Sequence, residues 1–143
     1  MAIIMTSIEK LIRACVDDER ALRRGARNVG AGPRQKLERL ASEREQFVDE
    51  LRTVGTTLSG RPRATGSWSG FARAITERGW AFAAGPNAGD AIAACRRSQH
   101  RTEALFAVAL ESSWTTGVRA ALVEQHRRIA DAEGALVAMQ YPV

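Results

Sequence analysis

The chain has few of the side chains from which metal sites and disulfide scaffolds are built. Its 143 residues include only two Cys and two His, and aromatic residues make up 6% of the total. This inventory excludes a zinc ribbon, a disulfide-stapled scaffold and a His-rich metal site. No apolar run approaches the ~18 residues that a membrane span requires. The apolar start at Met1–Met5 lacks the basic residues that precede a targeting signal, so we expect a cytoplasmic protein with reduced thiols.

The remaining composition is that of one globular domain. Hydrophobic residues make up 45% of the chain and charged residues 26%, and the length fits a single domain over residues 1–143. The net charge is +5, and much of the excess lies in residues 61–86, which hold four Arg and one Glu. Because 19 of the 21 basic residues are Arg, we attribute the bias to genome composition rather than phosphate recognition. Nucleic acid is therefore not the expected partner.

In the first half of the chain, apolar residues recur every three or four positions, which is typical of amphipathic helices. The capping-box sequence Thr-Ser-Ile-Glu at Thr6–Glu9 predicts the start of a first helix, and Asn28 with the glycines after it predicts its end. Pro33 suits the first turn of a second helix, where its missing N–H costs nothing. The inward-facing positions predicted for these two helices are Ile8, Leu11, Ile12, Cys15, Glu19, Leu22, Ala26, Leu37, Leu40, Arg44, Phe47, Leu51, Val54 and Leu58.

Two further long helices are predicted in the second half. The sequence Asn-Ala-Gly-Asp at 87–90 has the form of a helix cap with an acid in the first turn, and a fourth helix is predicted from Thr115 or Thr116. No strand-like alternation of apolar and polar residues is found. The inward-facing positions predicted here are Ala91, Ile92, Cys95, Gln99, Thr102, Phe106, Ala109, Leu110, Val118, Leu122, Gln125, Ile129, Ala132, Leu136 and Met139.

The segment of about residues 59–86 interrupts this pattern. It opens with loop-forming Gly and Pro, and a shorter helix is predicted over about 67–83. The other two links are short and make antiparallel neighbours, whereas this segment is long enough to travel the length of a bundle. The second and third long helices are therefore expected to be parallel. The predicted fold is all-α: a ferritin-like four-helix bundle with one long crossover between the second and third helices containing a short extra helix.

Three stretches of the chain are similar to a bacterial ferritin-like family of unknown function. They are Leu11–Asp17 (Leu-Ile-Arg-Ala-Cys-Val-Asp), Ser42–Leu51 and the glycine-rich step Gly66–Gly70. The likeness spans about residues 6–140. It implies a ferritin-like four-helix bundle and no established activity. The chain departs from the family pattern in the third helix, where Ser98–His100 (Ser-Gln-His) stands in place of an expected Gly-Glu-Asp step.

A di-iron centre is the chemistry that this architecture commonly hosts. It needs a Glu from each of two helices and a Glu-x-x-His pair from each of the other two. No Glu in the chain has a His three residues later. The inward polar residues are instead Glu19, Arg44, Gln99 and Gln125. Because Arg44 would put a fixed cation where a ligand should be, we expect no metal and no cofactor. We predict instead a structural polar layer, with a Glu19–Arg44 ion pair completed by Gln99 and Gln125.

Other catalytic arrangements receive little support from the sequence. His100 and His126 lie among arginines, which favours exposed helix positions over metal ligation or acid–base roles. Cys15 and Cys95 lie on apolar stripes, where a thiol packs as a small hydrophobe with a raised pKa rather than acting as a nucleophile. No Gly-rich phosphate loop or dinucleotide fingerprint is found. The sequence therefore names no catalytic residue.

The crossover carries the residues best suited to a partner. Arginines interleaved with aromatic side chains suit an acidic or nucleic-acid partner, although a solvated surface is the simpler interpretation. Trp68, Trp80 and Trp114 lie in or beside connections, where such residues more often cover the open ends of a bundle. The candidate partner surface comprises Arg61, Arg63, Trp68, Arg73, Arg78 and Trp80.

These observations favour a non-enzymatic bundle. We expect it to act by association with itself, as a homo-oligomer, or with another protein, in a bacterial stress response. One alternative is a metal-binding ferritin-like oxidoreductase. A weaker alternative is the binding of nucleic acid or an acidic partner through the basic crossover.

Overall fold

Four α-helices are the regular elements of the described part of the chain, which is residues 2–59 and 88–141 of a computed structural model. No strand occurs in those two ranges, so the all-α class is confirmed for them. The short helix predicted over about 67–83 lies outside the described residues. The helices are α1 (Ala2–Arg27), α2 (Ala31–Ser59), α4 (Ala88–Ala109) and α5 (Thr116–Gln140).

Most helix boundaries follow the local signals in the sequence. Pro33 lies in the first turn of α2, and α5 begins directly after Thr115, which is its N-cap. The predicted start of the first helix at Thr6 is wrong, because α1 already begins at Ala2. The Met5 side chain reaches α2 at Gly55, 3.7 Å from the position that a Cβ would take there. Packing between helices therefore extends α1 past its local capping signal.

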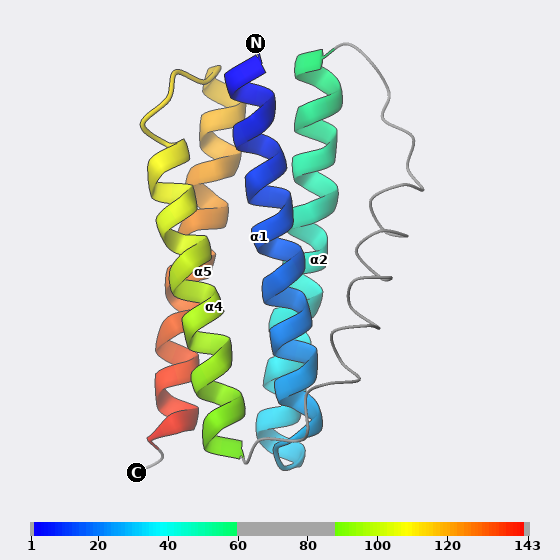
Figure 1. Ribbon diagram of the computed structural model, residues 1–143, viewed down its shortest axis with the longest axis vertical. Coiled ribbons are helices and arrows are strands. Elements are labelled where there is room, and N and C mark those ends of the chain that lie inside the picture. Colours follow the sequence, from blue (N-terminus) through cyan, green and yellow to red (C-terminus); the bar gives the residue numbers. More distant parts are fainter. Residues whose placement is uncertain (1, 60–87, 142–143) are drawn as a thin grey trace.

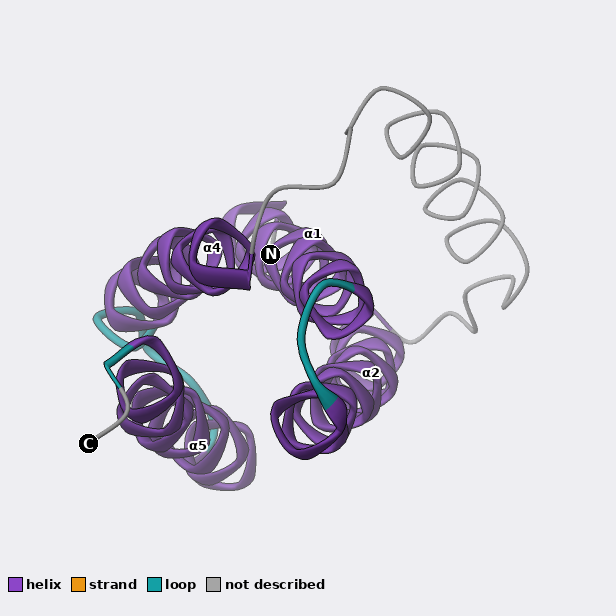
Figure 2. Cartoon of the chain, turned by 90° about the horizontal axis from the view of Figure 1, so that it is seen from below, coloured by secondary structure: helices purple, strands orange, loops and turns teal. Residues whose placement is uncertain are grey.

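The four helices form a bundle in which the second and third run parallel, as the length of the crossover predicted. Figure 1 shows α1 running down the bundle, α2 and α4 both running up, and α5 running down. Seen end-on, the helices form a ring in the order α2, α1, α4, α5 (Figure 2). Helix α1 packs against both α2 and α4, and α4 packs against α5, whereas α2 and α5 make the weakest contact among the neighbouring pairs of the ring. Each helix is thus antiparallel to its neighbours in the ring.

The described residues form two hydrophobic core clusters, which lie toward the upper and the lower end of the bundle in the orientation of Figure 1. The upper cluster contains Ile8, Leu11, Ile12, Cys15, Phe47, Val48, Leu51, Phe106, Ala109, Leu122 and Ile129. The lower cluster contains Leu22, Ala26, Val29, Leu37, Ala41, Ile92, Cys95 and Leu136. Between the two lies a level of buried polar side chains, described below. Among the described helices, none combines the length and the apolar character needed to cross a membrane.

Helices α1 and α4 approach closely at Gly25, and this contact predicts the effect of a single methyl group. A Cβ at Gly25 would lie 2.9 Å from Cys95 Sγ and 3.4 Å from Leu37 Cδ1. Overpacking of this kind costs about 1–3 kcal/mol, which exceeds the gain of about 1 kcal/mol from replacing a helical glycine. We expect Gly25→Ala to lower the free energy of urea unfolding, and Cys95→Ala in the same chain to restore most of the loss.

Gly134 provides the matched control for this prediction. It also lies inside a helix, but apart from its own helix backbone and chain neighbours no atom lies within 4 Å of the position that a Cβ would take. Measured at a concentration where the chain is monomeric, Gly134→Ala should therefore raise the free energy of unfolding by about 0.5–1 kcal/mol, through helix propensity alone. If Gly25→Ala and Gly134→Ala raised the free energy of unfolding equally, the close approach of α1 and α4 would be contradicted.

A buried polar cluster as the candidate functional site

Five buried polar side chains meet at the middle of the bundle, and we call them the central polar cluster. Its members are Asp18 of α1, Arg44 of α2, and Ser98, Gln99 and Thr102 of α4. Helical spacing places the last three on one side of α4, because residues three and four positions apart share a face. The main chain of α5 is a sixth partner, through the Ile129 carbonyl, so the cluster joins all four helices.

Arg44 is the centre of this cluster. Its guanidinium is fully buried, which is rare for an arginine unless the charge is paired. Its Nη2 donates to Gln99 Oε1 at 2.9 Å, and its Nη1 donates to Glu43 Oε1 at 3.0 Å. Gln99 in turn donates from Nε2 to the Ile129 carbonyl of α5 at 2.7 Å. Arg44 and Gln99 together therefore link α2, α4 and α5 through the interior.

Asp18 supplies the buried negative charge that faces Arg44. Its Oδ1 accepts from Ser98 Oγ at 2.6 Å and from Thr102 Oγ1 at 2.8 Å, and its Oδ2 accepts from Arg44 Nε at 3.4 Å. Burial raises the pKa of the Asp18 carboxyl above its ordinary value, although Ser98, Arg44 and Thr102 each act to lower it. Desolvation thus outweighs the attraction between the two charges.

The predicted ion pair between Glu19 and Arg44 is wrong, because Asp18 is the carboxylate of α1 that faces Arg44. Glu19 is half-buried, and its Oε1 accepts from Arg23 Nε at 3.0 Å one turn along the same helix. Arg23 also reaches Glu45 of α2 at 3.2 Å. The physical reason is that α1 packs against two helices at once. Asp18 lies on the side toward α4, whereas Glu19 lies at the edge of the contact with α2.

The two predicted glutamines are both buried, but only one belongs to the central polar cluster. Gln99 binds Arg44 directly, as described above. Gln125 of α5 donates from Nε2 to Glu50 Oε2 of α2 at 2.8 Å. Its Oε1 is buried and has no hydrogen-bond partner among the described residues. Gln125 therefore joins α5 to α2 along their common edge, separately from Arg44.

The residues of the central polar cluster do not fit a di-iron centre. Both oxygens of Asp18 accept hydrogen bonds from protein donors, and the group beside them is a guanidinium, which cannot lose its proton. Within the described ranges, no three His, Cys, Asp or Glu side chains are grouped as a metal ion would require. This arrangement fixes the register of the helices, because only one alignment of the four helices satisfies all of its hydrogen bonds.

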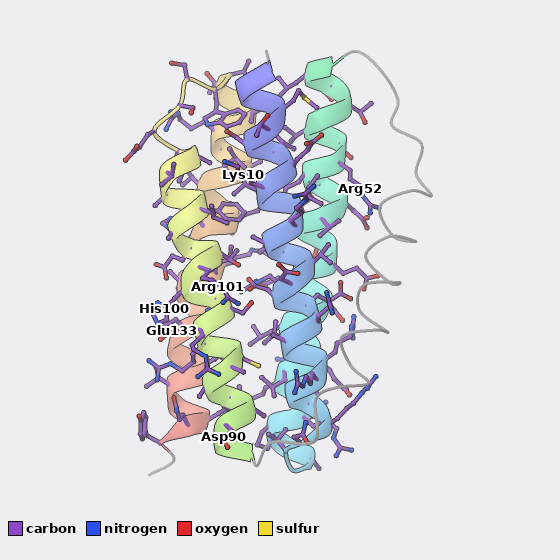
Figure 3. All side chains as sticks on the ribbon, viewed as in Figure 1. Lys10, Arg52, Asp90, His100, Arg101 and Glu133 are labelled. Atoms are coloured by element: carbon purple, nitrogen blue, oxygen red, sulfur yellow. The ribbon has the colours of Figure 1, made fainter. Side chains whose placement is uncertain are left out.

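The two histidines occupy the outer side of the bundle. His100 is 59% exposed, and its Nε2 lies 3.3 Å from Glu133 Oε1, which also accepts from Arg96 Nη2 at 2.9 Å. Figure 3 shows His100 and Glu133 together where α4 passes α5. His126 is half-buried. The prediction of an exposed position is confirmed for His100.

Both cysteines are free thiols packed inside the bundle, as predicted. Cys15 is fully buried in the upper cluster, and burial raises its pKa far above the ordinary value. Burial likewise raises the pKa of Cys95 to about 12, and its Sγ lies 3.2 Å from the Ala21 carbonyl oxygen. Neither thiol therefore has the thiolate character that a nucleophile needs.

This placement predicts a large difference in reactivity between the folded and unfolded chain. At pH 8, a thiol reagent should label both cysteines within seconds in denaturant, because their pKa values then return to the ordinary value near 9. In the native protein, labelling should be slower by orders of magnitude and should follow the rate of unfolding or local opening. The release of a chromophoric thiolate, followed with and without denaturant, measures both rates. Rapid labelling of both native cysteines would contradict the packing.

Among the remaining predicted residues, Trp114 lies in the connection between α4 and α5. Trp114 is half-buried, packs against the upper cluster and donates from Nε1 to the Ala109 carbonyl at 2.7 Å. It thus covers one end of the bundle, as expected for a tryptophan beside a helix connection. The candidate partner surface of Arg61, Arg63, Trp68, Arg73, Arg78 and Trp80 lies outside the described residues.

Comparisons of this chain with protein families, with curated proteins and with solved structures find no match.

Proposed function

We propose that this chain is a ferritin-like four-helix bundle that works by association of its outer surface with a second copy of itself, and not by redox chemistry at an interior metal. The parallel course of α2 and α4, each antiparallel to its neighbours, supports this type of bundle. The buried guanidinium of Arg44 supports a structural interior, because it takes the central position that metal ligands would need.

The outer face of α5 is the observation that carries the proposal of association. Val123 and Tyr141 are 49% and 65% exposed, and they are the large apolar side chains that α5 and its C-cap leave uncovered. Helical spacing places exposed small residues on the same face, on either side of the ion pair between Arg127 and Asp131, which are 57% and 67% exposed. The small residues are Ala120, Ala130, Gly134 and Ala138. Since α5 packs against α4 on one side and makes only a weak contact with α2, this outer face is not covered by the other described helices.

Sedimentation equilibrium at micromolar concentration tests the association. We expect a species of about twice the 15.6 kDa chain mass. Val123→Glu should convert it to monomer, since the new charge would be buried between two α5 helices. Gln46→Glu adds the same charge at an exposed position of α2 and should leave the dimer intact. A monomer for the unmodified chain, or a dimer that survives Val123→Glu, would overturn the proposed α5 interface.

Metal analysis tests the second half of the proposal. Protein purified without chelators should contain iron and manganese far below one atom per chain. A stoichiometric amount of either metal, lost after Asp18→Asn, would favour the oxidoreductase alternative and contradict a purely structural role for the central polar cluster.

A further inference from the structure

A hollow of about 250 Å³ lies on the outer side of the seam between α1 and α4, next to the central polar cluster. Each helix contributes four residues to its lining at the spacing i, i+3, i+4 and i+7, so each set forms one continuous stripe. The lining residues are Lys10, Arg13, Ala14 and Asp17 of α1, and Ser98, Arg101, Thr102 and Leu105 of α4.

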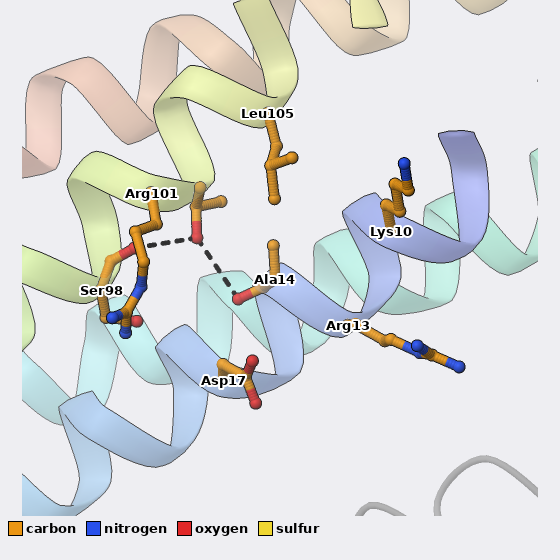
Figure 4. Close-up of a pocket in the computed structure, with 8 residues that line it drawn as sticks. Lys10, Arg13, Ala14, Asp17, Ser98, Arg101 and Leu105 are labelled. Carbon is orange, nitrogen blue, oxygen red and sulfur yellow. Dashed lines mark hydrogen bonds between the residues drawn. The ribbon is translucent and has the colours of Figure 1, made fainter. Parts of the chain in front are cut away.

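The charge of this hollow is strongly unbalanced. Lys10, Arg13 and Arg101 are exposed cations at its rim, and Asp17 is the single carboxylate that lines it. The rest of α4 and α5 carries nearly equal numbers of acids and bases. In Figure 4, Arg101 folds back beside Ser98, while Lys10 and Arg13 extend from α1 on long side chains. Cationic groups on flexible side chains around a concave surface raise the local concentration of an anion.

The inner wall of the hollow is polar at one end and apolar at the other. Ser98 and Thr102 place their hydroxyls toward Asp18 beneath, which leaves hydroxyl oxygens as acceptors at the base of the hollow. Ala14 and Leu105 form the apolar part. A ligand with an anionic head at the rim and a compact body against Ala14 and Leu105 would match both surfaces.

The geometry points to this hollow as a binding site for a small phosphate monoester. Three cations against one carboxylate suit a group with about two negative charges, which a phosphate monoester carries at neutral pH. Arg101 can donate two parallel N–H bonds to phosphate oxygens, and Lys10 supplies a point charge. The volume exceeds that of inorganic phosphate, and the compact body of the ester would fill the remainder.

Asp17 makes the site selective and testable. It lies on the same stripe as Lys10 and Arg13, and its ion pair is with Arg20 outside the hollow, at 3.9 Å, so its negative charge repels a bound phosphate. Removal of this carboxylate should therefore tighten binding, whereas removal of a rim cation should weaken it. On a nonspecific basic surface, the affinity for the phosphate would change by the same amount for every substitution that alters the charge by one unit.

Isothermal titration calorimetry at low ionic strength, with phenyl phosphate as probe, tests the site. We expect saturable binding of one ligand per chain, at least tenfold tighter than that of benzoate, which has one charge instead of two. Arg101→Gln and Lys10→Gln should each weaken phenyl phosphate binding about tenfold, the usual value of a hydrogen bond to a charged group. Asp17→Asn should strengthen it severalfold. Arg39→Gln, on the exposed side of α2, should change nothing.

Three outcomes would overturn the inference. The first is the absence of saturable heat up to millimolar phenyl phosphate. The second is an equal loss of affinity in Arg39→Gln and Arg101→Gln, which would indicate nonspecific screening. The third is tight binding of an oligodeoxythymidine that Arg101→Gln abolishes, in a chain that does not bind phenyl phosphate. All the substituted side chains are exposed, so circular dichroism of each variant should match that of the unmodified protein.

Discussion

Asp18→Ala is expected to lower the free energy of unfolding by about 3–5 kcal/mol, because it removes the fully buried carboxylate that faces Arg44 and the acceptor of Ser98 and Thr102. The carboxylate that remains beside Arg44 is Glu43, which is part-exposed. Glu19→Ala, one residue later, should cost no more than about 1 kcal/mol. Glu19 is part-exposed and pairs with Arg23 within the same helix, so its loss strands no buried charge. Urea unfolding of the two variants, followed by circular dichroism, gives both values under the same conditions.

The same cluster predicts that removing both charges is far less costly than removing one. Burial raises the pKa of Asp18 despite the nearby guanidinium, so the folded protein disfavours the ionised carboxyl. Desolvation of the pair therefore offsets its attraction, and Asp18→Leu combined with Arg44→Met should cost less than Asp18→Ala alone. The cost that remains comes from Ser98 and Gln99, which lose hydrogen-bond partners. If Asp18→Ala and Glu19→Ala shift the urea midpoint equally, the central polar cluster does not have the structural role assigned to it.

The raised pKa of Asp18 also fixes the sign of a pH effect. The folded state binds the proton more readily than the unfolded state, whose ordinary value is near 3.8. The stabilisation from this titration is therefore fully present below pH 3.8 and is lost as the pH rises through the pKa of the folded state. The Asp18→Leu, Arg44→Met chain lacks this titration. As the pH rises from 3.8 through the folded-state pKa of Asp18, its free energy of unfolding should therefore rise relative to that of the unmodified chain.

Periodicity in the sequence was sufficient to predict the helices and their core faces. The stripe on α5 places Leu122, Gln125 and Ile129 inward, and all three are buried. Local caps were less reliable: Thr115 marks the start of α5, but the equally good signal at Thr6 lies inside α1. A capping sequence contributes about 1 kcal/mol, which the packing of the Met5 side chain against α2 at Gly55 can exceed.

The choice of acid in the central polar cluster could not be settled from spacing alone. Asp18 and Glu19 both lie three or four residues from Cys15 and from Leu22, so either fits an inward stripe. The difference comes from α1 having two buried sides, one toward α2 and one toward α4. The small residue Ala14, one turn before Asp18, was the available signal that a second helix packs on that side.

Phe47→Ala is expected to lower the free energy of unfolding by about 3–5 kcal/mol, as a large aromatic side chain leaves a cavity in the upper cluster. Phe47 is also in contact with the central polar cluster, since Arg44 Cζ lies 5.3 Å from the centre of its ring. Because this guanidinium is desolvated, the attraction between cation and ring contributes about 2 kcal/mol in addition to the apolar area.

Leucine substitutions separate these two contributions. Phe47→Leu keeps most of the apolar volume and removes the ring from beneath Arg44. Phe106→Leu makes the same change at an equally buried phenylalanine of the same cluster. Measured by urea unfolding, Phe47→Leu should lower the free energy of unfolding by about 1–2 kcal/mol more than Phe106→Leu does. This difference should disappear when both substitutions are repeated in the Asp18→Leu, Arg44→Met chain, because that chain has no guanidinium over the ring. Equal costs at the two phenylalanines in the unmodified chain would mean that the ring of Phe47 contributes only by its volume.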